Sequence, residues 1–279
     1  MDQSLIDSRF LGVDRLYGVG STARLACTRV CVVGIGGVGS WVVEALARSG
    51  VGQLALVDAD DVCLGNTNRQ LHALDGEYGR AKVAVMAERA RRINPGLVVD
   101  AIEQFLTPSN LADLLGRGHD LVIDCCDAFR VKVETVAWCR RRKIPLITCG
   151  SAGGRTDPTL VSVRDLSRTE HDALLALVRK KLREEFNFPR GAKRYFGVQA
   201  VYSRENVRYP QPDGSVCGLR PVQTGGFKLD CGGGLGAVTH LTGAFAFAAV
   251  SRAIPRLLAA GEARQASAEA ESPSSAMPG

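Results

Sequence analysis

The glycine pattern in residues 29–49, RVCVVGIGGVGSWVVEALARS, constrains the fold more than any other feature of the chain. The apolar run at 29–33 predicts a strand, and the amphipathic run at 38–49 predicts a helix. A G-x-G-x-x-G loop between a strand and a helix is typical of phosphate-binding turns, because glycine permits a tight turn and lets phosphate approach the backbone at the helix N-terminus. We therefore predict a nucleotide-binding loop formed by Gly34, Gly36, Gly37 and Gly39.

Short apolar runs alternate with amphipathic runs beyond this loop. We expect strands at 53–57, 97–102, 121–124 and 145–148, and helices at 82–93, 109–115 and 131–142. This alternation predicts an α/β fold, with a Rossmann-like, mostly parallel sheet and helices on both faces. Because ligands bind at the carboxyl ends of the strands in such sheets, the site should include Gly34, Asp58, Asp124 and the loops after them.

The second half of the chain departs from the regular alternation. Strands at 160–163 and 197–203 flank a charged helix expected at 170–186. We divide the chain into a nucleotide-binding core with an N-terminal helical arm at 1–150, a substrate-binding extension ending in a helix at 151–260, and a disordered tail at 261–279. Residues 232–251 carry no charge. Their Gly, Ala and Thr content favours a buried core helix over a membrane span.

Charge and cysteine content narrow the class of protein. The 35 Lys and Arg against 29 Asp and Glu give a net charge of +6, which favours an anionic partner where the charges cluster. The nine cysteines are an odd number, and residues 1–10 carry no secretory signal, so we expect reduced thiols in a cytoplasmic protein. The sequence has no C-x-x-C pair, so no zinc is expected.

Polar side chains gather directly after the second expected strand. The run VDADDVCLGNTNRQ, residues 57–70, holds carboxylates, amides and an arginine in one loop. Asp58 is placed to accept ribose hydroxyls, while Arg69 can neutralise phosphate oxygens and Asn66 can orient them. The further candidates for nucleotide contact in this loop are Asp60 and Asn68. A hydride-transfer enzyme needs no such cluster at this place, so the loop favours ATP over NAD.

Two later residues fit the same crevice. Lys82 begins a predicted helix, where its ammonium and the free backbone donors could share a triphosphate. Asp127 follows the strand at 121–124 and is suited to holding Mg²⁺ through one carboxylate plus phosphates. Each also has a simpler interpretation, Lys82 as a solvated lysine and Asp127 as a helix N-cap. Their convergence on one predicted crevice favours the nucleotide interpretation.

The motifs GIGGVG, DADDV, NTNRQ, GRAK and DCCDA, in this order between residues 29 and 148, resemble the ThiF, MoeB and ubiquitin-activating family of adenylating enzymes. That family uses ATP and Mg²⁺ to activate a carboxylate as an acyl-adenylate. The resemblance implies that Gly36 and Gly39 contact phosphate or adenosine, and that Asp58 binds the ribose. It implies a homodimer in which one arginine reaches into the partner's site. The implied catalytic residues are Arg9, which is that arginine, Arg69 and Lys82 at the triphosphate, and Asp127 at the metal.

Four further segments resemble a branch of the family that acts on tRNA: RLYG, NTNRQLHAL, RRKIPLITCGSAGG and GGGLGAVTHLTGAFAF. For this branch the resemblance implies ATP-dependent dehydration of N6-threonylcarbamoyladenosine next to the anticodon, by cyclisation through a carboxyl-adenylate. The substrate's own carbamoyl group would be the nucleophile, and a tethered nucleophile requires no enzyme thiol.

A tRNA substrate requires a surface for RNA. The loop at 187–195 interleaves basic residues with Phe188 and Tyr195, which suits phosphate contacts combined with base stacking. We predict that Arg190, Lys193 and Arg194 contact the tRNA. The basic runs at 140–143 and 179–183 are further candidates, although each is equally well explained as a solvated face.

Several alternatives remain open at this point. The chain could adenylate the C-terminal Gly-Gly of a small ubiquitin-like sulfur carrier, but activators of such carriers usually hold zinc through C-x-x-C pairs. Many of them also use a thioester cysteine, for which Cys231 is the one candidate here, and a packing role suits it better. An NAD-dependent oxidoreductase and a membrane-associated adaptor are weaker alternatives. A sulfur-relay protein or cysteine desulfurase as partner, and a monovalent cation that orders the loops, also remain open.

Overall fold

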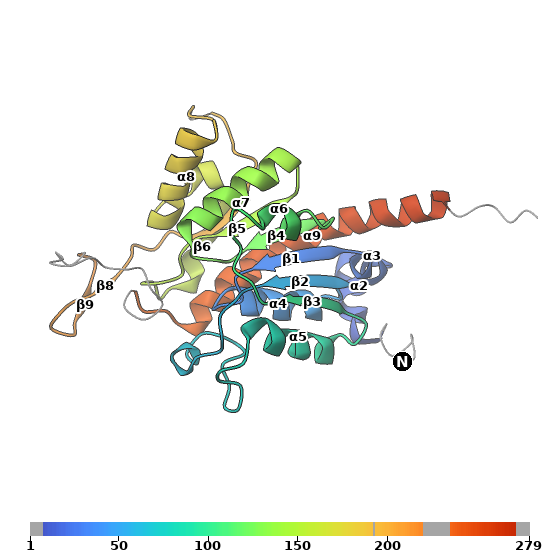
Figure 1. Ribbon diagram of the computed structural model, residues 1–279, viewed down its shortest axis with the longest axis horizontal. Coiled ribbons are helices and arrows are strands. Elements are labelled where there is room, and N and C mark those ends of the chain that lie inside the picture. The colour runs from blue at the N-terminus through green and yellow to red at the C-terminus, as the bar shows by residue number, and fades with distance from the viewer. Residues whose placement is uncertain (1–7, 192, 220–234, 272–279) are drawn as a thin grey trace, which may run out of the picture.

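A seven-stranded sheet forms the centre of the protein in the computed structural model, which describes residues 8–191, 193–219 and 235–271 (Figure 1). The strand order is β3-β2-β1-β4-β5-β7-β6, and every neighbouring pair is parallel except β6 with β7. The strands are β1 (Arg29–Val33), β2 (Gln53–Val57), β3 (Val98–Ile102), β4 (Leu121–Asp124), β5 (Leu146–Cys149), β6 (Val161–Asp165) and β7 (Gln199–Ser203). The expected mostly parallel α/β fold is confirmed.

Helices cover both faces of this sheet. One face carries α4 (Gly39–Arg48), α5 (Lys82–Ile93) and α9 (Thr239–Glu271), and the other carries α6 (Leu111–Leu115), α7 (Phe129–Arg142) and α8 (Ala173–Glu185). Two short helices, α2 (Leu11–Tyr17) and α3 (Ser21–Ala26), precede β1. The central strands are buried on both sides, which explains why they appear in the sequence as unbroken apolar runs.

The second half of the chain shares the core of the first half. β7 pairs in parallel with β5, with Ile147 opposite Gln199, so the sheet continues without a break. The long helix α9 packs along α4 and α3, and its buried residues belong to the same apolar cluster as those of α4. The predicted extension is therefore built into the sheet of the nucleotide-binding core. A small hairpin, β8 (Tyr209–Pro210) with β9 (Val216–Cys217), projects from the body (Figure 1).

Helix α9 is longer than the sequence suggested. We expected disorder from residue 261, whereas the helix continues to Glu271, and only residues 272–279 of that predicted tail lie outside the described part. Tertiary contacts explain the difference. A Cβ atom built on Gly261 would lie 2.2 Å from the carbonyl oxygen of Arg24, so the two backbones are in close contact. Arg264 also forms an ion pair with Asp120 at 2.9 Å.

The same helix contains the uncharged segment for which a membrane span was the alternative. By length and composition alone, Thr239–Ala266 could cross a bilayer. In the fold, Leu241, Phe245, Ala249 and Ala253 are fully buried against the sheet and α4. Their four-residue spacing places them on one face of the helix. The structure therefore favours the expected core helix.

Candidate nucleotide-binding and active site

The glycine loop lies at the carboxyl edge of the sheet, between β1 and α4. Gly34 adopts a left-handed φ of 82°, as the tight turn requires. A Cβ atom built on Gly39 would lie 1.8 Å from the carbonyl oxygen of Gly34, so helix and turn pack too closely for any side chain there. At Gly36 the nearest atom to a built Cβ is Nε2 of Gln70, at 3.7 Å. The backbone at Gly36 is therefore open to a ligand, whereas Gly37 lies against Thr242 of α9.

Asp58 joins this loop to the end of β2. Its Oδ2 accepts the backbone N–H of Ile35 at 2.6 Å, and its Oδ1 accepts that of Asp60 at 2.9 Å. The half-buried carboxylate thus fixes two loops that approach the nucleotide position. Its hydrogen bond to ribose stays a prediction.

Lys82 is the first residue of α5 and is 5% exposed. Its Nζ donates to Oδ2 of Asp60 at 2.7 Å, and its backbone N–H donates to the carbonyl of Asp60 at 3.0 Å. The α5 N-terminus and the ammonium therefore lie together at the carboxyl edge. An ammonium that is nearly removed from water needs negative charge beside it. Asp60 supplies that charge here, and phosphate oxygens bound at the α5 N-terminus would share the ammonium.

The NTNRQ loop connects this edge to the start of α9. Asn68 donates from Nδ2 to the carbonyl of Ala237 at 2.7 Å, and Arg69 donates from Nη1 to Gly65 O at 3.0 Å and Asn68 Oδ1 at 2.9 Å. The Asn66 side chain is buried. The structure thus gives Asn68 a scaffolding contact, and phosphate binding by Asn66 and Arg69 stays a prediction.

Gln70 and His72 are two buried polar residues of the same loop that were not among the predicted site residues. Nε2 of His72 lies 2.7 Å from the carbonyl oxygen of Ile35 and must carry the proton, because a carbonyl only accepts. Burial lowers the pKa of His72, which keeps the ring neutral. Nδ1 of His72 and Oε1 of Gln70 have no hydrogen-bond partner among the described residues. Polar residues inside the apolar run QLHAL were the signal that could have revealed them.

Asp124, which we expected at the nucleotide site, is instead engaged inside the fold. It is fully buried and accepts from Nζ of Lys132 at 2.6 Å and Oγ1 of Thr148 at 2.7 Å. A carboxylate at this depth needs a charged partner, and Lys132 on α7 supplies one. Asp124 also accepts the backbone N–H of Cys126 at 3.2 Å, so it supports the turn that carries the exposed Asp127.

The described residues contain no group of three His, Cys, Asp or Glu side chains arranged to hold a metal ion. Mg²⁺ is commonly held by one or two carboxylates together with substrate phosphates. Asp127, exposed at the carboxyl edge next to the glycine loop, fits that mode of binding.

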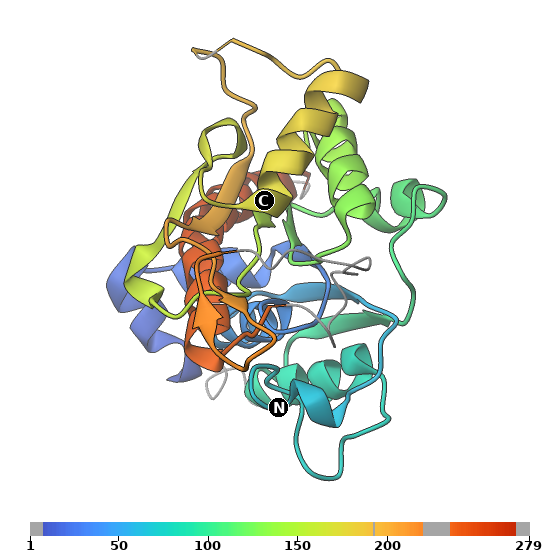
Figure 2. The same ribbon diagram turned by 90° about the vertical axis from the view of Figure 1, so that its left-hand side faces the viewer.

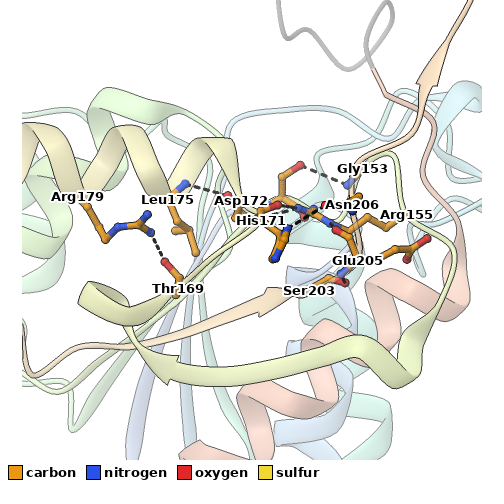
Figure 3. A network of polar contacts seen from close by, with 11 residues as sticks. Gly153, Arg155, Thr169, His171, Asp172, Leu175, Arg179, Ser203, Glu205 and Asn206 are labelled. Carbon is orange, nitrogen blue, oxygen red and sulfur yellow. Dashed lines mark hydrogen bonds and ion pairs between the residues drawn. The ribbon is translucent and has the colours of Figure 1, made fainter. Parts of the chain in front are cut away.

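A second polar network closes the edge on the side of β5 and β7 (Figure 3). The side chains of Arg155 and Asp172 are fully buried, 3.9 Å apart. Arg155 also donates to the carbonyls of Ser151, His171 and Glu205, which follow β5, precede α8 and follow β7. One guanidinium therefore ties together three loops beside the site, a role that was not predicted from the sequence.

Four predicted residues lie away from this edge. Arg9 donates to the carbonyl of Ile93 at 3.4 Å, at the far end of α5 from Lys82. Twelve residues of helix separate those ends by about 16 Å, so Arg9 does not reach the site of its own chain. The other three, Arg190, Lys193 and Arg194, are exposed in the loop that follows α8, a helix length from the edge. Cys231 lies outside the described residues.

The comparisons with known proteins agree with the geometry. A model of the ThiF family matches residues 8–272. The tRNA threonylcarbamoyladenosine dehydratase of Escherichia coli is 48% identical over 251 residues, which are 90% of this chain and 94% of that protein. The enzyme of the same name from Haemophilus influenzae is 48% identical over 252 residues, with the same coverage of 90% and 94%.

A solved structure extends the similarity to three dimensions. The crystal structure of the E. coli tRNA N6-threonylcarbamoyladenosine dehydratase, TcdA, in complex with ATP superimposes with a TM-score of 0.80 at 43% identity. The match covers 93% of this chain and 97% of that one. The resemblance inferred from the motifs is confirmed, and the chain belongs to the ThiF family.

Proposed function

We propose that this protein is an ATP-dependent tRNA threonylcarbamoyladenosine dehydratase. One observation carries the proposal: Lys82, the Asp58-fixed loop and the open backbone at Gly36 meet at one edge of the sheet. The near full-length similarity to dehydratases, one of them solved with ATP, supports this choice within the family. It also disfavours the NAD-dependent alternative.

The reaction would take place in two steps. A carboxylate oxygen of the threonylcarbamoyl group attacks the α-phosphorus of ATP, and pyrophosphate leaves. The substrate's own carbamoyl group then attacks the activated carbonyl carbon, closes a ring and releases AMP, so the nucleoside loses one water in total. Because the nucleophile is tethered to the electrophile, its effective concentration is high and no enzyme thiol is needed.

The chain's own residues would bind and orient the reactants. Lys82 and Arg69 would neutralise the triphosphate, the backbone at Gly36 would lie beside it, and Asp58 would accept from the ribose. When bound, Mg²⁺ would neutralise further phosphate charge, and Asp127 is the residue that would hold it.

The protein would act as a homodimer, with Arg9 entering the site of the partner subunit. The support for this arrangement is the position of Arg9 at the far end of α5 from Lys82 in its own chain. Arg190, Lys193 and Arg194 would contact the tRNA away from the reacting groups.

The test is an ATP–pyrophosphate exchange assay with purified protein and Mg²⁺. It compares tRNA carrying threonylcarbamoyladenosine, tRNA lacking it, and no tRNA. Exchange and AMP release that depend on the modified tRNA, with loss of one water from the nucleoside by mass spectrometry, are the expected result. A parallel arm contains a small ubiquitin-like protein ending in Gly-Gly. Exchange that depends on that protein, with modified tRNA inert, would replace the proposal by the sulfur-carrier alternative.

A further inference from the structure

A cluster of exposed basic residues lies at the ends of α7 and α8 that point away from the nucleotide edge. We name it the cationic end. Its members are Arg140, Arg141, Arg142, Lys143, Arg190, Lys193 and Arg194. The two segments meet there, because a Cβ atom built on Gly197 would lie 3.1 Å from Cζ of Arg140. α7 and α8 lie side by side in both views (Figures 1 and 2).

This cluster is not balanced by carboxylates. Residues 139–144 and 187–197 contain no Asp or Glu. Nearby Glu184 and Glu185 are engaged by Lys180 and Lys181 of the same helix. Asp165 also approaches the loop, but its carboxylate accepts the backbone N–H groups of residues 196–198. Within the described residues, no carboxylate forms an ion pair with any member of the cationic end, so its positive potential stays available to a partner.

An exposed aromatic ring is part of the same surface. Tyr195 is 64% exposed, and Cζ of Arg168 lies over its ring at 4.9 Å. Cations beside an exposed aromatic face are typical of surfaces that bind a nucleic-acid backbone together with a base or sugar.

The distance between the cationic end and the nucleotide edge indicates how long a ligand must be to contact both. α7 begins two residues after Asp127 and runs for 14 residues to Arg142, so it carries the chain about 20 Å from that edge. A nucleotide or free nucleoside bound at the edge cannot reach so far. A polyanion whose reacting base sits at the edge and whose backbone continues along α7 and α8 can reach both places.

We propose that the cationic end binds the sugar–phosphate backbone of helical RNA in the tRNA, about 20 Å from the base that reacts. This inference rests on the proposed function for the identity of the RNA. The contact is electrostatic and independent of sequence, so it raises affinity for every tRNA and leaves the choice of the modified base to the nucleotide edge.

The test uses full-length protein in which Arg141, Lys193 and Arg194 are all replaced by Gln. Arg140 is left unchanged, because its guanidinium packs on Gly197 and joins the two segments. A matched control replaces Arg92, Arg252 and Arg256 by Gln, which removes the same charge from other exposed positions. Binding of modified and unmodified tRNA is measured across a KCl series, together with kcat and KM for modified tRNA and for ATP.

The cluster variant should bind both tRNAs about tenfold more weakly than the control at moderate salt, with a slope of log K against log [KCl] lower by about 2 to 3. KM for tRNA should rise by a similar factor, while KM for ATP and kcat at saturating tRNA stay unchanged. A cluster variant that matches the control in affinity and slope would overturn the proposal and leave this surface to a protein partner. If modified tRNA fails to stimulate ATP–pyrophosphate exchange even by the wild type, the proposed function fails. The comparison of salt slopes between the cluster variant and the control still tests separately whether the cationic end binds RNA.

Discussion

Nζ of Lys82 donates to Oδ2 of Asp60 at 2.7 Å, in an ion pair whose two partners are exposed very differently. The side chain of Lys82 is 6% exposed and that of Asp60 is 49% exposed. Asp60 is therefore solvated and holds the ammonium at the start of α5. Incoming phosphate oxygens can share this ammonium without an extra cost for taking it out of water.

We expect Lys82→Met to reduce ATP–pyrophosphate exchange by about 100-fold or more, because the variant loses a positive charge beside the leaving pyrophosphate. Arg256→Met, at an exposed arginine of α9, is the control and should retain wild-type exchange. Equal exchange rates for the two variants would remove Lys82 from the site.

The glycine loop offers a matched pair of substitutions. Gly39→Ala should destabilise the fold, because its Cβ would overlap the carbonyl of Gly34 at 1.8 Å. Gly36→Ala meets only Gln70 Nε2 at 3.7 Å, so its melting temperature should stay near that of the wild type while its ATP affinity drops. Thermal unfolding and calorimetric ATP titration measure the two effects. Unchanged ATP affinity in Gly36→Ala would mean that phosphate does not approach this residue.

His72 should make stability depend on pH. Burial holds its folded-state pKa below the ordinary 6.5. Above pH 6.5 the ring is neutral in the folded and in the unfolded chain, so protonation of His72 does not reduce the free energy of unfolding there. As pH falls below it, the unfolded chain takes up a proton that the folded chain refuses, so the free energy of unfolding decreases until the folded-state pKa is reached.

The His72→Gln variant tests this dependence, because glutamine can still donate to Ile35 O but does not titrate. Urea unfolding at about pH 7.5 and about pH 5.5 should show a smaller loss of stability in the variant than in the wild type. Some loss should remain, since burial also lowers the pKa of His119. An identical decrease in the free energy of unfolding in the two proteins would show that the pKa of His72 is the same in the folded and the unfolded chain.

Arg9 allows a test of the shared site in the dimer. Arg9→Ala and Lys82→Met should each be nearly inactive alone. When the two are mixed and allowed to exchange subunits, each heterodimer regains one complete site, so about a quarter of wild-type activity should return. An inactive mixture, with subunit exchange verified by mass spectrometry, would argue that Arg9 works within its own chain or not at all.

The Arg155–Asp172 pair should contribute strongly to stability. Arg155→Met leaves the Asp172 carboxylate buried without its charged partner and breaks contacts to three loops. We expect a loss of about 3–5 kcal/mol in the free energy of unfolding. The double variant Arg155→Met with Asp172→Asn should be less destabilised than the sum of the two single changes, because it leaves no lone buried charge. Strict additivity in urea unfolding would contradict a direct interaction.

The sequence by itself determined the local elements. The strands at 29–33, 53–57 and 121–124 and the helix at 82–93 agree with β1, β2, β4 and α5 to the residue. Buried parallel strands require continuous apolar runs, and helices require a periodic apolar face, so both are encoded in neighbouring residues. The glycine loop was predictable for the same reason, since steric demands at Gly34 and Gly39 act within a few residues.

Only the tertiary structure decided which polar groups meet. Asp124 resembled a ligand-binding acid at the end of a strand, yet Lys132 and Thr148, from a helix and a neighbouring strand, engage it internally. Arg155 and His72 acquired their roles in the same way, through loops brought together by the order of strands. Helix α9 was extended by contacts with Arg24 and Asp120, far away in sequence. The neighbour that neutralises a buried charged group depends on the packing of distant segments, and no local pattern encodes that packing.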